Sequence, residues 1–151
     1  METINNKIDN LFREIRSVKI YKASQYLFSS NFSRTPITTE PIITINNIIP
    51  GDFERSIKQK KDRNNRFYEI DCSIMIYSIT AESVNNWNTI LNQKDFVVEF
   101  ISNEESTIIG NQKEPLTIDV VDDIKENDTG TDAIVISIYG STIIEPWIKP
   151  L

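Results

Sequence analysis

The chain contains no histidine, and it has only one cysteine and four glycines among its 151 residues. The absence of histidine excludes the most common general base, the most common metal ligand and every Ser-His or Cys-His nucleophile pair. The four glycines lie far apart in the sequence, so they cannot form a glycine-rich phosphate-binding loop. These absences predict a protein that is not an enzyme and that binds no cofactor or metal.

Long apolar runs are also missing, and the longest are far shorter than the roughly 20 residues that a membrane helix needs. The N-terminal segment "METINNKIDNLFREI" carries acids and asparagines where a signal peptide would be apolar. Cys72 has no partner for an internal disulfide, and its apolar neighbours alternate along the chain, which predicts a buried, unreactive thiol. The chain is therefore expected to be made in a reducing cytoplasm and to have no membrane contact.

The apolar periodicity predicts one α+β domain built on a largely antiparallel sheet. Residues 1–18 have apolar positions at helical spacing and predict an N-terminal amphipathic helix. Val84, Trp87 and Leu91 form one stripe and predict a second helix over residues 81–91. The whole chain, 1–151, is then expected to divide into a helix (1–18), a hairpin or arm (36–66), a core sheet containing the second helix (66–145) and an extended tail (146–151).

The clearest strand pattern is "RFYEIDCSIMIYSIT", residues 66–80. Its first half alternates between apolar and polar residues, and in its second half Met75, Tyr77 and Ile79 make the other face apolar as well. The pattern predicts a strand that begins half-exposed and ends buried on both faces. In the last strand, Gly140 interrupts the alternation and predicts a bulge or a bend.

One basic stretch stands out in a chain whose net charge is −6. Six of the sixteen cations lie within twelve residues between two predicted strands, which predicts a long hairpin with a basic tip. These cations are Arg55, Lys58, Lys60, Lys61, Arg63 and Arg66. Phe53 and Phe67 only flank the stretch, so stacking on bases is not indicated, and specific nucleic-acid reading is not expected. A solvated loop, non-specific phosphate contact and protein contact remain as interpretations.

Residues 119–132 form an acidic counterpart, with six acids and one lysine. Thr129 and Ile136 occupy positions where a calcium-binding EF-hand loop needs an acid or amide and a glutamate, so a calcium loop is not predicted. The segment is either a solvated turn or a surface for the basic loop of another copy. The acids predicted to make that contact are Asp122, Asp123, Glu126 and Asp128.

The C-terminal "EPWIKPL" contains Trp147 between two prolines, Pro146 and Pro150. The prolines are incompatible with a central strand, which predicts the extended tail. Trp147 could anchor the tail on a neighbouring subunit or fold back onto its own core, and the sequence leaves both alternatives open.

The order of the elements, with "SVNNWNTIL" followed by "FVVEFIS" and "IIGNQKEPLTIDV", resembles small neck and tail proteins of tailed phages. These are the tail-terminator and ring-type connector proteins that stack below the portal. The wealth of Ile, Asn and Lys is similar to that of phages of gut Bacteroidales, including the crAss-like group. No diagnostic motif accompanies the resemblance, so it assigns no functional residue.

The resemblance implies a virion structural protein, a subunit of a homo-oligomeric ring in the neck or tail. Its partners would be copies of itself and other neck and tail proteins of the virion, with at most non-specific DNA contact. It would be made in the cytoplasm of the host bacterium and end in the virion. The alternative is a monomeric, non-catalytic module that binds protein or nucleic acid through the basic loop.

Overall fold

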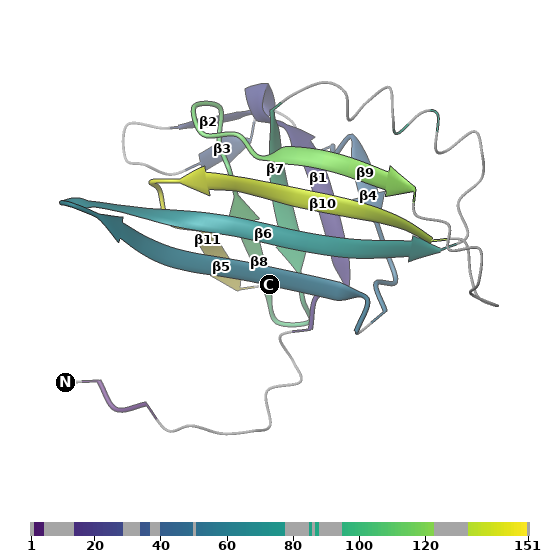
Figure 1. The fold of residues 1–151 in the computed structure, drawn as a ribbon, viewed down its shortest axis with the longest axis horizontal. Coiled ribbons are helices and arrows are strands. Elements are labelled where there is room, and N and C mark those ends of the chain that lie inside the picture. Colours follow the sequence, from purple (N-terminus) through teal and green to yellow (C-terminus); the bar gives the residue numbers. More distant parts are fainter. Residues whose placement is uncertain are drawn as a thin grey trace.

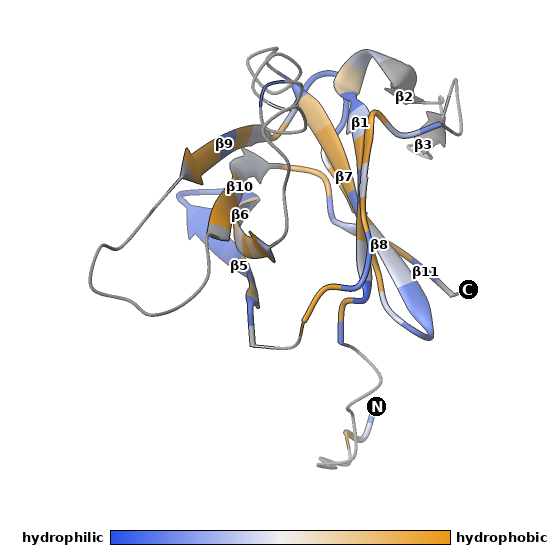
Figure 2. Ribbon diagram, turned by 90° about the vertical axis from the view of Figure 1, so that its right-hand side faces the viewer, coloured by the Kyte–Doolittle hydropathy of each residue, from blue (hydrophilic) through white to orange (hydrophobic). Residues whose placement is uncertain are grey.

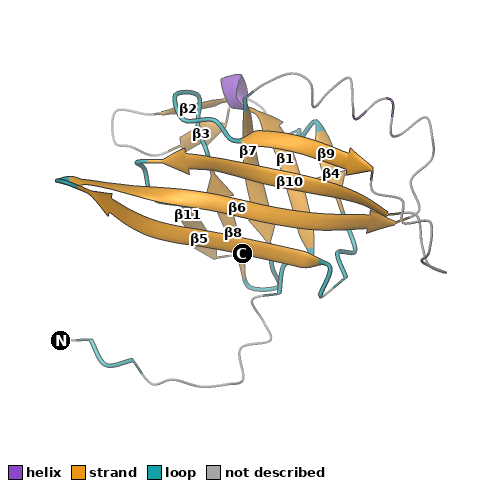
Figure 3. Ribbon diagram, viewed as in Figure 1, coloured by secondary structure: helices purple, strands orange, loops and turns teal. Residues whose placement is uncertain are grey.

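The computed structural model describes residues 2–4, 14–28, 34–36, 40–49, 51–77, 85, 87, 95–122 and 133–150. Almost every regular element in these residues is an antiparallel strand, and one is a short 3₁₀ turn (Figure 3). In chain order they are β1 Ser17–Lys22, η2 Ala23–Gln25, β2 Tyr26–Phe28, β3 Arg34–Pro36, β4 Ile43–Ile45, β5 Phe53–Asp62, β6 Asn65–Tyr77, β7 Phe96–Ile101, β8 Glu105–Ile109, β9 Thr117–Asp122, β10 Ala133–Thr142 and β11 Trp147–Pro150.

The strands form two large sheets and one small one. The first large sheet has the order β11-β8-β7-β1-β4, the second has the order β5-β6-β10-β9, and β2 pairs with β3 alone. In Figure 1 the strands of the four-stranded sheet cross those of the five-stranded sheet steeply. Figure 2, turned by a quarter, shows the two large sheets as separate layers facing each other. The architecture is a two-layer β-sandwich.

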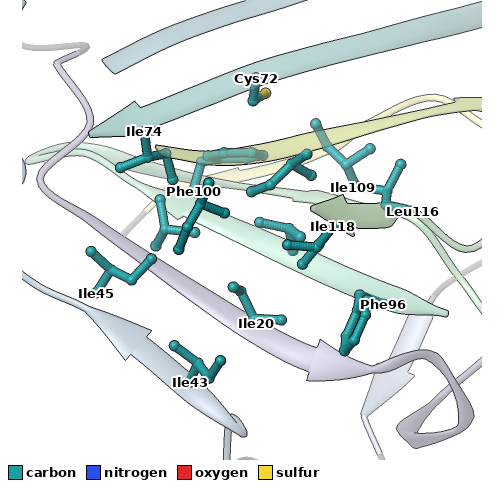
Figure 4. Packing of buried hydrophobic residues seen from close by; sticks show 14 of the residues in the cluster. Ile20, Ile43, Ile45, Cys72, Ile74, Phe96, Phe100, Ile109, Leu116 and Ile118 are labelled. Carbon is teal, nitrogen blue, oxygen red and sulfur yellow. The ribbon is translucent and has the colours of Figure 1, made fainter. Parts of the chain in front are cut away.

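The core lies between the two layers, where side chains from both inner faces interdigitate (Figure 4). Val18, Ile20 and Phe100 come from the five-stranded sheet, and Ile74 and Ile136 come from the four-stranded sheet; all are fully buried. Because strand residues alternate between faces, one apolar residue in every two suffices to build such a layer. The hydrophobic effect on these facing positions holds the sheets together.

The prediction of an α+β fold is wrong. No α-helix occurs among the elements of the described residues, and residues 17–18, placed in the predicted N-terminal helix, belong to β1. Val18 and Ile20 point into the core at two-residue spacing, and β1 pairs with β4 on one side and β7 on the other. Pairing on both sides satisfies the backbone of β1, and tertiary context overrides the helical spacing of the preceding residues. Residues 5–13 of that predicted helix lie outside the described residues.

The second predicted helix, residues 81–91, also lies almost wholly outside the described residues. Asn85 and Trp87 are described there with helical backbone, but two isolated residues define no element. Trp87 is half-buried and packs against the core cluster that contains Ile74.

Two other predicted boundaries differ from the structure. The long hairpin is formed by β5 and β6 and begins at Phe53, whereas β3 and β4 in the predicted arm belong to other sheets. The predicted tail is extended, but Trp147–Pro150 is hydrogen-bonded to β8 as β11, an edge strand. An edge position explains how a strand next to Pro146 and ending at Pro150 is tolerated, since a proline there removes no bond from the sheet interior.

Gly140 does not mark a bulge, contrary to the prediction. It pairs with Ile70 within an unbroken register between β10 and β6. A Cβ atom at this position would lie 2.9 Å from Cδ2 of Leu116, which is fully buried. Glycine is therefore favoured here by the close approach of the Leu116 side chain, which would have to shift to admit a Cβ atom, and not by the backbone conformation.

Candidate interaction surface

The β5–β6 hairpin extends beyond the rest of its sheet. β5 pairs with β6 from Phe53 opposite Ile74 to Asp62 opposite Asn65, whereas β10 accompanies β6 only as far as Tyr68. Residues 60–67 therefore form a two-stranded ribbon, called here the ribbon, which projects past the end of β10 (Figure 1). The hairpin predicted from the sequence is present, with basic residues at its tip.

A two-residue turn, Arg63-Asn64, closes the ribbon. Arg63 has a φ of 53°, in the left-handed region that side chains other than glycine rarely adopt. Turns that close tight hairpins require such a φ, because their twist must match that of the strands. The strain at Arg63 is therefore a consequence of the tight turn that holds the ribbon together.

The six predicted contact cations do not form one cluster. Arg55 lies on the inner face of β5, between Phe53 and Ile57, and its guanidinium lies over the ring of Phe100, 5.3 Å from the centroid. Phe53 packs on the same ring edge to face, with centroids 5.9 Å apart. Arg55 therefore joins the two sheets inside the sandwich, and its prediction as a partner contact is not supported by this placement.

The other five cations are exposed, and one of them is paired within its own sheet. Lys60 forms an ion pair with Glu69 on the outer face of β6. The hydrogen bond and the charge of Lys60 lower the pKa of Glu69 below its ordinary value. Lys61, Arg63 and Arg66 lie at the tip of the ribbon with Asp62 as the single acid, so the tip is cationic.

Lysines along an edge strand also have a simpler role. In the described part of the chain β5 pairs only with β6, so its other edge is the edge of the sheet. Lysine side chains on such an edge hinder the addition of another strand and thereby prevent aggregation. This reading accounts for Lys58, Lys60 and Lys61, which all lie on β5, but not for Arg63 in the turn.

Three of the four predicted acidic contact residues lie outside the described residues: Asp123, Glu126 and Asp128. Asp122 ends β9 at the register position opposite Ile134, near the start of β10. Asp122 and Ala133, which flank the acidic segment, are therefore at one end of the four-stranded sheet, and the ribbon is at the other end (Figure 1). The topology therefore separates the tip of the ribbon from Asp122 and Ala133 by the length of the sheet.

The acidic end carries a surface that the sequence reasoning missed. Met75, Val135 and Val121 are direct register partners on three adjacent strands, and they point to the outer face. Met75 is 38% exposed, so the prediction that β6 ends buried on both faces is wrong. Val121, on β9, is 48% exposed. We call these three residues the apolar row.

Acidic residues surround the apolar row. Asp52 continues the row on the β5 side, where its carbonyl accepts a hydrogen bond from the Met75 amide at 2.9 Å. Glu54 and Asp119 lie at the two ends of the adjacent row of the sheet. Asp119 accepts a hydrogen bond from the Tyr139 hydroxyl at 2.8 Å, which raises the pKa of that tyrosine. The outer face at this end is apolar at its centre and anionic at its margin.

The remaining predicted site residue, Trp147, begins β11 at the register position opposite Ile108. Its backbone thus belongs to the five-stranded sheet of its own chain. This strand carries Lys149, whose Nζ lies 3.7 Å from Oε2 of the largely buried Glu99.

Cys72 is fully buried on β6, as predicted from the alternation. Burial raises the pKa of its thiol to about 12. A thiol that stays protonated at neutral pH is a poor nucleophile. Cys72 therefore acts as a small apolar core residue.

A small cleft of about 290 Å³ opens between the two sheets where the edges of β5 and β11 diverge. Apolar atoms form most of its walls, which come from Ile57, Tyr68, Pro146 and Ile148, and Arg55 and Glu145 add charge. Its volume is at the lower limit for a small-molecule site.

The described ranges of the chain also bear on metal and membrane binding. Over those ranges, no three or more Cys, Asp or Glu side chains are grouped closely enough to hold a metal ion. No helix there has the length and apolar character that crossing a membrane requires.

No protein-family model, curated protein or solved structure matches this chain. The resemblance to neck and tail proteins of tailed phages therefore remains a prediction.

Proposed function

We propose that the protein is a non-catalytic structural subunit that assembles head to tail with copies of itself into a ring. The observation that carries the proposal is the separation of charge along the four-stranded sheet. Lys61, Arg63 and Arg66 are exposed at one end, and Asp52, Glu54 and Asp119 lie toward the other. Groups at opposite ends of one rigid sheet cannot meet within a chain, but they can meet between two chains.

Such a contact is heterologous, because it joins two different patches of the same subunit. Repetition of a heterologous contact gives a ring when the rotation between subunits closes, and a filament when it does not. A projecting ribbon suits this contact, because it can reach a neighbour without moving the sandwich. The resemblance described above provides the setting: the neck or tail of a tailed-phage virion, where other virion proteins would bind the ring.

The experiment uses charge reversal at the ribbon. A ribbon variant carrying Lys61→Glu, Arg63→Glu and Arg66→Glu should remain folded, because exposed charges contribute little to stability. It should no longer form the oligomer that light scattering detects for the unchanged protein. The matched control reverses three exposed cations elsewhere, Arg16, Lys22 and Lys113, and therefore changes the net charge equally.

Salt and a compensating variant complete the test. Raising the ionic strength from about 0.15 M to about 1 M shortens the screening length from about 8 Å to about 3 Å and should weaken the self-association. Reversal of Asp122, Asp123, Glu126 and Asp128 to Lys should restore assembly of the ribbon variant if the two segments face each other. A monomeric unchanged protein, or a ribbon variant that assembles like the control, would overturn the proposal.

The second candidate is a monomeric module that contacts nucleic acid or protein through the ribbon. The exposed cations at the ribbon tip favour it, since clustered cations bind phosphate without sequence preference. It predicts that the ribbon variant loses binding to DNA, with a marked salt dependence, and that assembly does not change. DNA retention on a filter, measured for the ribbon variant and for its control, distinguishes the two functions.

A further inference from the structure

We infer that the surface receiving the ribbon is the outer face of the four-stranded sheet around the apolar row, Met75, Val121 and Val135. This inference rests on the proposed self-assembly and identifies the surface of the neighbouring copy that takes part in it. The occupant is the ribbon, residues 60–67, of a second copy of this chain.

The apolar row has a distinct position on the outer face of the sheet. Successive residues on the outer face of this sheet are mostly polar near its middle, where Ser73 and Ser137 are register partners. One step further from the hairpin tip, three adjacent strands present Met75, Val135 and Val121 side by side. Single exposed apolar residues are ordinary on protein surfaces, but a contiguous apolar group marks an interaction site more often.

The ribbon and the margin of the apolar row also carry complementary charges. The ribbon tip carries Lys61, Arg63 and Arg66 against the single acid Asp62. The apolar row is bordered by Asp52 at its β5 end and by Glu54 and Asp119 in the adjacent row. Cations of the ribbon can therefore reach acids at the margin while the centre of the contact excludes water, as in other protein interfaces.

The ribbon carries an apolar residue of its own. Phe67 lies opposite Lys60 on the same face of the ribbon, and it is half-buried in the single chain. Lys60 is the cation beside Phe67 on this face, whereas Lys61 and Arg66 project from the opposite face of the ribbon. Phe67 can therefore lie on the apolar row while Lys60 and the turn residue Arg63 approach its acidic margin. Aromatic residues and arginine are the residue types that contribute most to binding energy when an interface buries them.

Side-chain contacts within the single chain already hold parts of the receiving surface in place. The Tyr139 hydroxyl donates to Asp119 at 2.8 Å, which fixes the orientation of that carboxylate. The Tyr77 hydroxyl lies 4.0 Å from Sδ of Met75, and hydrogen bonding to Asp52 raises the pKa of the tyrosine. Side chains fixed before binding lose less conformational entropy when the partner arrives, so the contact costs less to form.

A cysteine crosslink tests the contact directly. One chain carries Asn64→Cys at the ribbon tip, which preserves every cation, and the other carries Val121→Cys on the receiving face. Because the two positions lie at opposite ends of one sheet, a disulfide between them must join two chains. We expect the mixed chains to form a crosslinked dimer under mild oxidation, and buried Cys72 does not compete.

The control replaces Val121→Cys with Thr44→Cys, an exposed position on β4 of the other sheet. Crosslinking at the rate of this control would overturn the inference. A second measurement uses Met75→Lys with Val121→Lys, a face variant that should weaken self-association about tenfold or more, equivalent to about 1.4 kcal/mol.

The outcomes separate the inference from the proposed function. If the unchanged protein oligomerises but the face variant does so equally well, the receiving surface is wrong and head-to-tail assembly stands. If the unchanged protein is monomeric, both are wrong.

Discussion

The guanidinium of Arg55 lies over the ring of Phe100, 5.3 Å from the centroid, and links β5 of one sheet to β7 of the other. Replacing Arg55 with Met keeps most of the length of the side chain and removes its charge. Because a partly desolvated cation–π contact is worth about 1–2 kcal/mol, the free energy of unfolding should fall by that amount. Urea unfolding of the Arg55→Met variant measures it. Assembly should be unaffected, and loss of assembly with unchanged stability would place Arg55 at the subunit contact.

The sequence contains enough information to predict that Arg55 lies inside the sandwich. Phe53 and Ile57 flank it at two-residue spacing, so in a strand all three share one face. Counting cations over twelve residues ignores this alternation and groups inward and outward side chains together. The strands β6 and β10 were predicted because their alternation is long and regular. The division of the strands between two sheets was not predicted, because strand pairing depends on residues that are distant in the chain.

The apolar row shows a different limit. From the sequence alone, the apolar Met75 predicts that the outer face of β6 is buried there. The sequence pattern is the same whether that face is covered by its own chain or by a partner, so it cannot distinguish the two. The helix predicted over residues 1–18 is contradicted at residues 17–18 for a related reason. The spacing of Ile15 and Val18 fits a helix, whereas Val18 and Ile20 fit a strand, and only the presence of β4 and β7 decides between them.

Gly140 and Leu116 should show strong coupling. Gly140→Ala places a methyl group 2.9 Å from the Leu116 side chain, and the resulting overpacking should cost about 1–3 kcal/mol. Leu116→Ala alone should cost about 2–5 kcal/mol because it leaves a cavity. The double variant should be more stable than the sum of the two losses predicts, since the new methyl group enters that cavity. If the two losses of unfolding free energy, measured by denaturant unfolding, are additive, the side chains at positions 116 and 140 do not compete for the same space.

The turn of the ribbon should respond in opposite directions to two glycine substitutions. Arg63 has a φ of 53°, so Arg63→Gly should remove strain and stabilise the hairpin by about 0.5–1 kcal/mol. Asn64 does not have a positive φ, so Asn64→Gly should destabilise it, because glycine loses more entropy on folding. Thermal unfolding of both variants measures the difference. A destabilised Arg63→Gly variant would show that the Arg63 side chain makes a contact that stabilises the tip.

Cys72 should be nearly inert in the folded protein. With its pKa raised to about 12, only about one thiol in ten thousand is ionised at pH 8, and the side chain is buried as well. Alkylation should therefore be slow in native buffer and rapid in denaturant, where the thiol has its ordinary pKa. Mass spectrometry after timed exposure to iodoacetamide measures both rates. Rapid native modification would mean that β6 opens on the timescale of the reaction.

Head-to-tail assembly is tested most directly by mixing two variants that each lack one half of the contact. The ribbon variant (Lys61→Glu, Arg63→Glu, Arg66→Glu) keeps its receiving face, and the face variant (Met75→Lys, Val121→Lys) keeps its ribbon. Each should be monomeric alone in light scattering, and an equimolar mixture should form heterodimers and nothing larger. A mixture that stays monomeric, while the unchanged protein forms oligomers, would contradict the account.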